Sequence, residues 1–336
     1  MNKLIVLFIA FTLIACNSEL DSIIFKQFLK FIAKYNKKYS SINEFLARYQ
    51  VFRNNIMTLF NSPKTSFNTG ITQFSDLTKQ EFSKNYLNLN YDAIALFSNF
   101  SPYTVKNIKE APEEFDWRDY GVLERCIDQG ACGANWAIAT MGNLEPLYTA
   151  HYGIHKTFST QMLIDCDTLD SGCNGGLMEY AFTYLKNLGG IMLDADYPYR
   201  GIKSTCKYDS SKRINMRVTG YKKLGSSWST WSPVDEDEIK EFLYENGPLA
   251  IALNGNCLQT YTSGIIDLSE SQCPPSGINV AALLVGYGVS NGVKYWIVQN
   301  FWGCSWGENG YFRIRRGNGT CGVNCYIISG LVEFDD

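Results

Sequence analysis

The residues best suited to chemistry lie in residues 129–136, where the chain reads Gln-Gly-Ala-Cys-Gly-Ala-Asn-Trp. This glycine-containing turn leads into an apolar run, residues 136–141, which we expect to form a buried helix. The N-terminus of a helix can hold a thiolate, because the helix dipole and the free N–H groups lower the pKa of a thiol. The turn is therefore a place where sulfur chemistry would be expected.

Thiolate attack on a peptide bond requires two further groups. An imidazole pairs with the thiolate and protonates the leaving amine, and an amide side chain orients that imidazole. The chain contains only two histidines, His151 and His155. Both follow the predicted helix and lie outside the other glycine- and cysteine-containing motifs, so we interpret them as surface residues.

The N-terminal part is predicted to form a pair of amphipathic helices within residues 21–62. Apolar residues recur there at spacings of three and four, as expected for one buried face. They are Ile24, Phe28, Phe31, Ile32 and Tyr35 in the first helix and Phe45, Tyr49, Phe52, Ile56 and Leu59 in the second. Ser41 and Glu44 form a capping-box pattern that begins the second helix. Residues 91–112 lose this periodicity and contain two prolines, which predicts a linker.

The rest of the chain changes from helical to β patterns midway. Helical runs dominate residues 136–188, and short apolar strands follow one another beyond about residue 217. Two of these strands, residues 279–288 and 294–299, are joined around residues 290–292, Ser-Asn-Gly, which is a hairpin signal. We therefore predict an α+β fold in which a helical lobe and a β lobe enclose a cleft.

Composition limits the classes of function. The 336 residues carry a net charge of −3, which gives neither a basic surface for nucleic acid nor a polybasic membrane patch. Residues 1–16 combine a basic start with a short apolar run, as in a signal peptide, although Cys16 also fits a bacterial lipoprotein cleavage site. No later stretch is apolar enough to cross a bilayer. We expect a protein that is secreted, or routed through the endoplasmic reticulum to an endolysosomal compartment, without membrane contact after leader removal.

Eleven cysteines, ten of them beyond Cys16, indicate several disulfides and an oxidising compartment. Asn99 and Asn318 lie in Asn-X-Ser/Thr sequons and are candidate glycosylation sites. We expect no cofactor and no metal.

Two N-terminal motifs carry a family resemblance. Glu44, Arg48, Phe52, Asn55 and Leu59 resemble the helix motif of cathepsin L-type propeptides, with Leu in place of the usual Ile. Residues 70–76, Gly-Ile-Thr-Gln-Phe-Ser-Asp, resemble the second propeptide motif, with Thr72 where Asn is usual. The resemblance implies an inhibitory helical prosegment, residues 17–110, lying backwards through a substrate cleft and released by cleavage near residue 110.

Five later motifs extend the resemblance over nearly the whole chain. They are residues 115–118, 129–133, 172–176, 285–288 and 302–308. In this order they resemble the papain family, and within it cathepsin L-like proteases such as the viral cathepsins of insect viruses. The resemblance implies a papain-like peptidase domain over residues 111–336, with a helical lobe to about residue 216 and a β-barrel-like lobe from about residue 217.

The resemblance also assigns the positions of the reaction machinery. Gln129 matches the glutamine of the oxyanion hole, Asn300 the asparagine that orients the imidazole, and Trp302 the tryptophan that shields this pair. Two catalytic positions are substituted. Asn135 stands at the position of the nucleophilic cysteine, and Val280 stands at the position of the histidine.

These substitutions remove the reacting groups. A carboxamide does not ionise to a nucleophile near neutral pH, and valine has no proton to transfer. Loss of the nucleophile or base from a comparable triad costs roughly 10⁶-fold in rate. We expect Asn135 to act as the N-cap of the helix and Val280 to pack in a buried strand.

The resemblance pairs six cysteines as Cys132–Cys173, Cys166–Cys206 and Cys273–Cys321. Cys126, Cys257, Cys304 and Cys325 are left over, and a Cys126–Cys304 pair remains open. On the same resemblance, Gly175 and Gly176 would present backbone to an extended peptide. Leu177 and Met178 would line an apolar specificity pocket, and Trp302 would border the groove.

Three functions are compatible with these features. The first is a secreted, zymogen-like pseudoprotease whose cleft binds its own prosegment and then a peptide, a protease inhibitor or an active protease. The alternative is an active cysteine endopeptidase of the viral cathepsin type, using Cys132 or another thiol in an acidic or extracellular compartment. A structural or storage protein that binds no ligand is the third.

Overall fold

The computed structural model describes residues 19–89, 110–123, 126–224 and 233–335. The predicted signal peptide, Cys16, most of the predicted linker and the sequon at Asn99 lie outside the described residues. The proposed boundaries at residues 16 and 110 therefore stay predictions. Within the described part of the chain, the helices are too short or too polar to traverse a bilayer.

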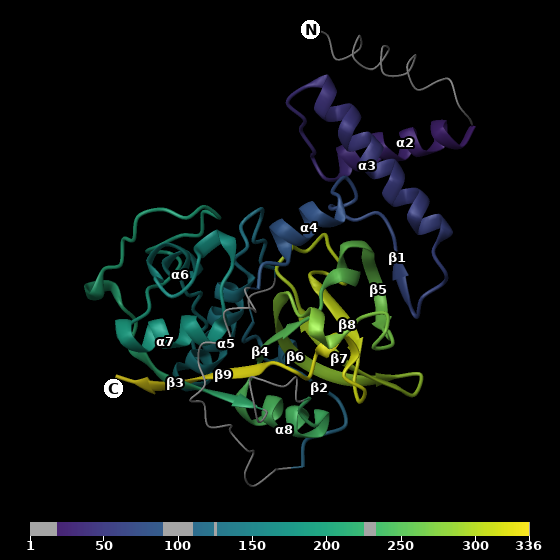
Figure 1. Cartoon of the computed structure of the whole chain (residues 1–336). Coiled ribbons are helices and arrows are strands. Elements are labelled where there is room, and N and C mark those ends of the chain that lie inside the picture. Colours follow the sequence, from purple (N-terminus) through teal and green to yellow (C-terminus); the bar gives the residue numbers. More distant parts are fainter. Residues whose placement is uncertain (1–18, 90–109, 124–125, 225–232, 336) are drawn as a thin grey trace.

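The described part of the prosegment, residues 19–89, begins with the predicted helical pair. Helices α2 (Glu19–Lys34) and α3 (Ile42–Asn61) cross each other and lie apart from the two lobes (Figure 1). Their apolar stripes form a separate core that includes Phe28, Phe31 and Phe52. The Ser41 side chain caps α3 by accepting a hydrogen bond from the Glu44 N–H. The Glu44 carboxylate binds the N–H of Ser40 rather than that of Ser41, so only half of the expected capping box is formed.

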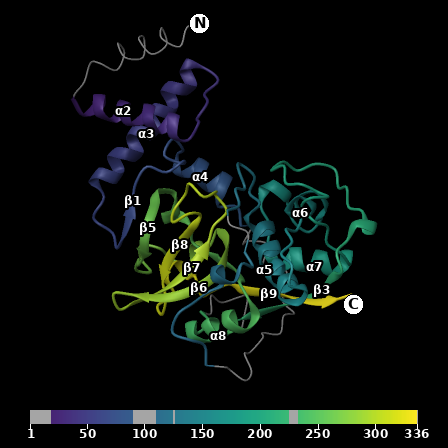
Figure 2. The ribbon, with the colours of Figure 1, turned by 180° about the vertical axis from the view of Figure 1, so that it is seen from behind.

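The prosegment then crosses onto the β lobe and toward the cleft. Strand β1 (Phe67–Thr69) pairs antiparallel with β5 (Tyr261–Ile266) and so extends the sheet of the β lobe by one strand. Helix α4 (Lys79–Tyr86) follows, and a complete capping box between Thr78 and Glu81 begins it. Figures 1 and 2 show α4 lying over the region where the two lobes meet.

The helical lobe is built around α5 (Asn135–Tyr152), with α6 (Thr160–Cys166) and α7 (Met178–Leu188) beside it. Every residue from 135 to 146 is buried, which confirms the predicted buried helix. The helix is apolar around most of its circumference because neighbours cover it on all sides. It packs against α7 and against strands of the β lobe, so its N-terminus lies where the two lobes meet.

The sheet has the strand order β1-β5-β8-β7-β6-β4-β9-β3, with β2 paired to β6 outside this path. The strands of the β lobe are β2 (Phe115–Asp116), β3 (Met216–Leu224), β4 (Leu249–Leu253), β6 (Val280–Ser290), β7 (Val293–Gln299), β8 (Tyr311–Arg315) and β9 (Ile327–Phe334), and α8 (Glu236–Asn246) packs beside them. Asn291 and Gly292, both with positive φ, make the two-residue turn between β6 and β7 that the sequence predicts. Figure 2 shows the same arrangement from behind.

Alternating residues of β4 and β6 face two different cores. Ala252, Ala281 and Leu283 belong to the core shared with α5–α7, whereas Leu253 and Val280 belong to the core of the β lobe. Since side chains alternate along a strand, an apolar run buried on both faces serves both lobes at once. This central position of β6 explains why its sequence is almost continuously apolar.

Four disulfides are present among the described residues. The three expected pairs, Cys132–Cys173, Cys166–Cys206 and Cys273–Cys321, are present. The pair that the sequence left open, Cys126–Cys304, is also formed. Cys257 and Cys325 are free thiols.

Candidate functional site

Asn135 lies at the first residue of α5 and is fully buried. The expectation that it caps this helix is wrong, because the N-cap is Ala134 and no side-chain cap bond is made. The Asn135 amide is used elsewhere. Its Oδ1 accepts a hydrogen bond from the N–H of Ala281 at 3.3 Å, and its Nδ2 donates to the carbonyl oxygen of Tyr86 at 3.2 Å.

Val280 is the first residue of β6, pairs with Leu253 of β4, and is fully buried as predicted. The hydrogen bond from Ala281 to Asn135 therefore joins the two substituted positions across the lobes. The side chains of Val280 and Leu87 both lie over Gly255. A Cβ added to Gly255 would be 2.7 Å from Val280 Cγ1 and 2.9 Å from Leu87 Cδ2, so this packing requires glycine.

Gln129 and the segment from Asn300 to Trp302 lie side by side. The N–H of Gln129 donates to the carbonyl oxygen of Phe301 at 2.8 Å, and Asp128 forms an antiparallel bridge with Trp302. Gln129 Nε2 donates to the carbonyl oxygen of Cys132 at 2.9 Å, at the turn before α5. The side chain matched to the oxyanion hole is thus directed at the turn that precedes Asn135.

The Asn300 side chain is buried but orients no imidazole. Its Oδ1 accepts a hydrogen bond from the N–H of Phe301 at 2.9 Å, and its Nδ2 has no hydrogen-bond partner within the described residues. The indole nitrogen of Trp302 also lacks a partner there, although the ring is fully buried. Buried polar atoms normally find partners, so these amide and indole atoms mark a site that is incompletely satisfied.

The last described residues of the prosegment pack beside these residues. Leu89 forms a parallel bridge with Gly176, and its N–H donates to the carbonyl oxygen of Asn279 at 3.1 Å. Asn88 lies so close to Gly133 and Gly175 that a Cβ on either glycine would overlap it. The backbone at these glycines therefore lies against the protein's own N-terminal segment. Binding of a separate extended peptide at Gly175 and Gly176 stays a prediction.

Leu177 and Met178 directly follow Gly176, which pairs with Leu89 of the prosegment. Both are buried in the core of the helical lobe, and Leu89 of the prosegment belongs to the same apolar cluster. The N–H of Leu177 donates to Asp170 Oδ1 at 2.8 Å, which holds the loop that carries Gly176. Their role in a specificity pocket stays a prediction.

A second group of contacts docks the prosegment on the β lobe. The rings of Phe74, Phe82 and Tyr86 lie 5.1, 5.3 and 6.1 Å from the ring of Trp302, and Trp306 stacks edge-on behind it at 4.9 Å. Gln73 Nε2 donates to the carbonyl oxygen of Trp302 at 2.9 Å. The main contact of Trp302 is therefore with the prosegment.

One docking contact of the prosegment was not predicted from the motifs. Thr72 Oγ1 donates to the carbonyl oxygen of Gln259 at 2.6 Å, and Gln259 Nε2 donates in return to the carbonyl oxygen of Leu77 at 3.0 Å. Thr72 is the residue that departs from the usual propeptide motif, and its hydroxyl makes a direct bond to the peptidase domain. Gln259 lies outside every motif, so no sequence signal pointed to it.

Comparison with known proteins assigns the family. Residues 111–331 match the model of the papain family cysteine proteases, and residues 28–82 match the cathepsin propeptide inhibitor domain. The chain belongs to the papain family of cysteine proteases. Its architecture is that of a cathepsin-like zymogen, with the propeptide in the same chain.

Relatives of this papain-family chain include viral and animal cathepsins. It is 38% identical over 310 residues to the viral cathepsin of Adoxophyes honmai nucleopolyhedrovirus, covering 88% of each chain. It is 36% identical over 314 residues to cathepsin F of Drosophila melanogaster, matching 91% of this chain but only half of that longer protein. Two solved structures are similar along their full length. Digestive procathepsin L 3 of Tenebrio molitor and a recombinant stem bromelain precursor have TM-scores of 0.78 and 0.79, each with 30% identity and coverage of 91% of this chain and 98% of theirs.

The hydrogen bonds of Asn135 in this papain-family chain go to Tyr86 and Ala281, and neither involves an imidazole or a thiol. His151 is in the last turn of α5, slightly earlier than expected, and its ring stacks on Phe334 at 3.8 Å. Cys132 is bonded to Cys173. Burial raises the pKa of the Cys257 thiol to about 12 and that of the Cys325 thiol to about 11, so both stay protonated at neutral pH.

Proposed function

We propose that this papain-family chain is a secreted pseudoprotease, made as a zymogen-like precursor whose cleft binds peptide but does not hydrolyse it. One observation carries the proposal. The position matched to the nucleophile holds the Asn135 amide, and this amide is hydrogen-bonded to the backbone beside Val280, which is matched to the imidazole position.

The contacts of Asn135 support a structural role for its side chain. Both amide atoms are occupied, one by the N–H of Ala281 and the other by the carbonyl oxygen of Tyr86. A carboxamide held in this way bridges the two lobes and the prosegment without any proton transfer. Absence of both nucleophile and base leaves only the oxyanion donors, and this costs roughly 10⁶-fold in rate in a comparable triad.

No other sulfur provides a ready replacement among the described residues. Cys132 is close to Asn135 in sequence but forms a disulfide with Cys173. Cys257 and Cys325 are the free thiols, and burial keeps both protonated. A cysteine protease needs a thiolate of lowered pKa, and these thiols have the opposite shift.

The groove itself supports binding. Gly175 leaves room for the backbone of Asn88 and Gly133 for its side chain, and the prosegment already pairs with Gly176. A peptide, a protease inhibitor or an active protease that presents an extended segment would use the same strand pairing. We propose that such a partner binds after another enzyme has removed the prosegment, because an inactive zymogen does not cut itself.

The test restores the two missing groups. We compare the unmodified chain with the Asn135→Cys, Val280→His double variant after both have been matured by an added protease that is then removed. The measurements are hydrolysis of a Phe-Arg fluorogenic peptide and covalent capture by a thiol-reactive epoxide peptide. We expect no turnover and no capture by the unmodified chain, and both from the double variant.

The single variants are the matched controls. Asn135→Cys alone is expected to be captured slowly because its thiol lacks an imidazole, and Val280→His alone is expected to be inert. Stoichiometric capture or turnover by the unmodified chain would contradict the proposal and establish the active endopeptidase. Failure of the matured chain to bind any leupeptin-like peptide in calorimetry would favour a structural or storage protein.

A further inference from the structure

Three sulfur atoms lie together in the β lobe, one of them in the turn that follows β4. The Sγ atoms of Cys257, Cys273 and Cys321 are all within 4.8 Å of one another. Cys273 and Cys321 form a disulfide, whereas Cys257 is a free thiol. A free thiol beside a disulfide is the arrangement from which thiol–disulfide exchange proceeds.

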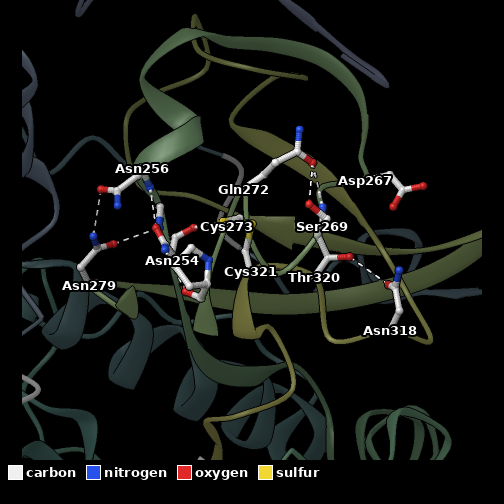
Figure 3. Close-up of a disulfide and its surroundings, with 12 residues drawn as sticks. Asn254, Asn256, Asp267, Ser269, Gln272, Cys273, Asn279, Asn318, Thr320 and Cys321 are labelled. Carbon is white, nitrogen blue, oxygen red and sulfur yellow. Dashed lines mark hydrogen bonds between the residues drawn. A yellow bond between two sulfur atoms is a disulfide. The ribbon is translucent and has the colours of Figure 1, made fainter. Parts of the chain in front are cut away.

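Each of the three sulfurs is held by a different segment. Cys257 lies in the 3₁₀ turn η5 (Asn256–Thr260), which connects β4 to β5. Cys273 follows β5, and Cys321 lies in the turn η7 (Thr320–Gly322) with a positive φ of 57°. In Figure 3 the disulfide lies between two groups of polar side chains, one with Asn254, Asn256 and Asn279 and the other with Ser269, Gln272 and Thr320.

We propose that Cys257, Cys273 and Cys321 form a thiol–disulfide exchange site whose state is coupled to docking of the prosegment. In the exchange, the Cys257 thiolate attacks Cys273 Sγ and forms a Cys257–Cys273 bond. The Cys273–Cys321 bond breaks, and Cys321 leaves as a thiolate that takes up the proton lost by Cys257. The step is an isomerisation and needs no external oxidant or reductant.

The surroundings of the three sulfurs favour this product. Asn254 contacts one of the two sulfurs that would join and the residue before the other. Its carbonyl oxygen is 3.6 Å from Cys273 Sγ, and its Oδ1 accepts a hydrogen bond from the N–H of Asn256, next to Cys257. Cys321 instead lines a cavity of about 900 Å³, together with Cys325. This cavity leaves room for the turn that carries Cys321 to shift when its sulfur leaves.

The turn that carries Cys257 is also a docking element for the prosegment. The carbonyl oxygen of Thr260 accepts a hydrogen bond from the N–H of Gly70 at 2.9 Å. Gln259 accepts one from Thr72 and donates one to Leu77. Gly255, at the other end of η5, packs under Leu87 of the prosegment. The prosegment thus contacts η5 at both ends, and Cys257 of the same turn lies beside the Cys273–Cys321 disulfide.

The contacts between the prosegment and η5 keep the Cys257 thiol unreactive in the zymogen. Burial raises the pKa of Cys257 to about 12, so very little thiolate exists at neutral pH. Exchange requires that η5 move enough to hydrate the sulfur. Loss of the prosegment removes the bonds to Thr260 and Gln259, so we expect exchange to be faster once the prosegment is loosened or removed.

The test maps disulfides in the full chain without added reductant. The protein is incubated at pH 8.5, quenched with acid, alkylated under denaturing conditions and digested for mass spectrometry. We compare the unmodified chain with Thr72→Val, which removes the bond to Gln259 while keeping the side-chain volume. The matched control is Thr58→Val, because the Thr58 hydroxyl bonds only within α3, to the carbonyl oxygen of Asn54.

We expect a Cys257–Cys273 peptide with Cys321 alkylated, and a several-fold faster appearance of it in Thr72→Val than in Thr58→Val. Cys257→Ser is expected to abolish this product, and Cys325→Ser, which removes the other free thiol, is expected to leave it unchanged. Recovery of alkylated Cys257 with an intact Cys273–Cys321 pair in every sample would overturn the exchange. Equal rates in Thr72→Val and Thr58→Val would overturn the coupling to the prosegment.

Discussion

The prosegment and the peptidase domain are both packed around aromatic residues, but different contacts reinforce them. The prosegment contains no cysteine from residue 17 to residue 110, and ion pairs such as Lys37–Asp76 and Arg48–Glu81 surround its packing. The peptidase domain has four disulfides and keeps several carboxyl groups buried, among them Asp167 and Asp170. The two parts of one chain should therefore respond differently to acid and to loss of covalent links.

Protonation acts on the two regions in opposite directions. The pKa of Glu81 is lowered, mainly by its hydrogen bond with Arg48, so its stabilising contribution is lost as the pH falls through that lowered value. The pKa of Asp170 is raised by burial and by repulsion from Asp167, and burial likewise raises the pKa of Asp167. Folding thus favours the protonated form of this pair, and stability decreases as the pH rises above the ordinary aspartate range. Acid should loosen the prosegment while it stabilises the helical lobe.

The largest expected effect separates the two cores. Phe52→Ala removes a fully buried ring from the core of α2 and α3 and is expected to destabilise the prosegment by about 3–5 kcal/mol. Unfolding of the peptidase domain should change little. Limited proteolysis and hydrogen exchange of α3 measure the destabilisation of the prosegment. Phe60→Ala is the control, because Phe60 is 73% exposed on the same helix. Equal effects of the two variants would contradict a separate prosegment core.

The reverse experiment removes a disulfide from the helical lobe. Cys132→Ser with Cys173→Ser is expected to destabilise the peptidase domain by about 2–5 kcal/mol, because the unfolded chain regains the freedom of a closed loop. Hydrogen exchange of α5 should report the loss, while exchange in α2 and α3 stays as before. Cys325→Ser serves as control because it removes a cysteine without breaking a disulfide. Equal destabilisation of α2 would show that the two regions unfold together.

The buried aspartates give the pH dependence of the helical lobe. Between pH 5 and 8, the free energy of unfolding of the helical lobe in the unmodified chain is expected to fall with rising pH. The fall is up to about 1.4 kcal/mol per pH unit for each proton that folding takes up. Asp170→Asn should flatten this slope, because an amide holds no ionisable proton. Asp209→Asn, in an exposed turn of the same lobe, should leave the slope unchanged. Denaturant unfolding at several pH values measures the slope of the unfolding free energy against pH. Equal slopes in Asp170→Asn and the unmodified chain would show that Asp170 does not cause the pH dependence.

The smallest effect concerns the ionic contacts of the prosegment. Glu81→Gln removes the partly exposed pair with Arg48 and is expected to cost about 0.5–1 kcal/mol at pH 7. The variant should also lose part of the acid sensitivity of prosegment release, which can be followed by protease accessibility from pH 7 to 4. Glu19→Gln, at an exposed carboxylate at the start of α2, is the control. Unchanged acid sensitivity in Glu81→Gln would assign the effect to other groups.

Local patterns and family motifs predicted much of this molecule. The helical stripes, the turn at Asn291 and Gly292, and the burial of Val280 follow from residue spacing alone, because each depends on neighbours along the chain. The complete capping box of Thr78 and Glu81 has the same residue spacing as the predicted one of Ser41 and Glu44. Three of the four disulfides followed from the family resemblance.

The remaining features depend on residues that are distant in sequence. Asn135 was expected to cap its own helix, but its amide serves Tyr86 and Ala281, which are 49 and 146 positions away. A side chain forms hydrogen bonds with whatever groups the fold brings close to it. Here the bonds to Tyr86 and Ala281 replace a cap bond within α5. The proximity of Cys257 to Cys273 and Cys321, and the bond from Thr72 to Gln259, could not be predicted for the same reason.

The strand pairing between Leu89 and Gly176 has a further consequence for any ligand of the cleft. An occupant on the same chain competes at an effective concentration on the order of millimolar, so a free peptide of ordinary affinity is excluded before it can bind. On the proposed function, a single cut by another protease removes this competitor. The protein would then report that proteolysis has occurred nearby, by making available a surface that was hidden until the cut.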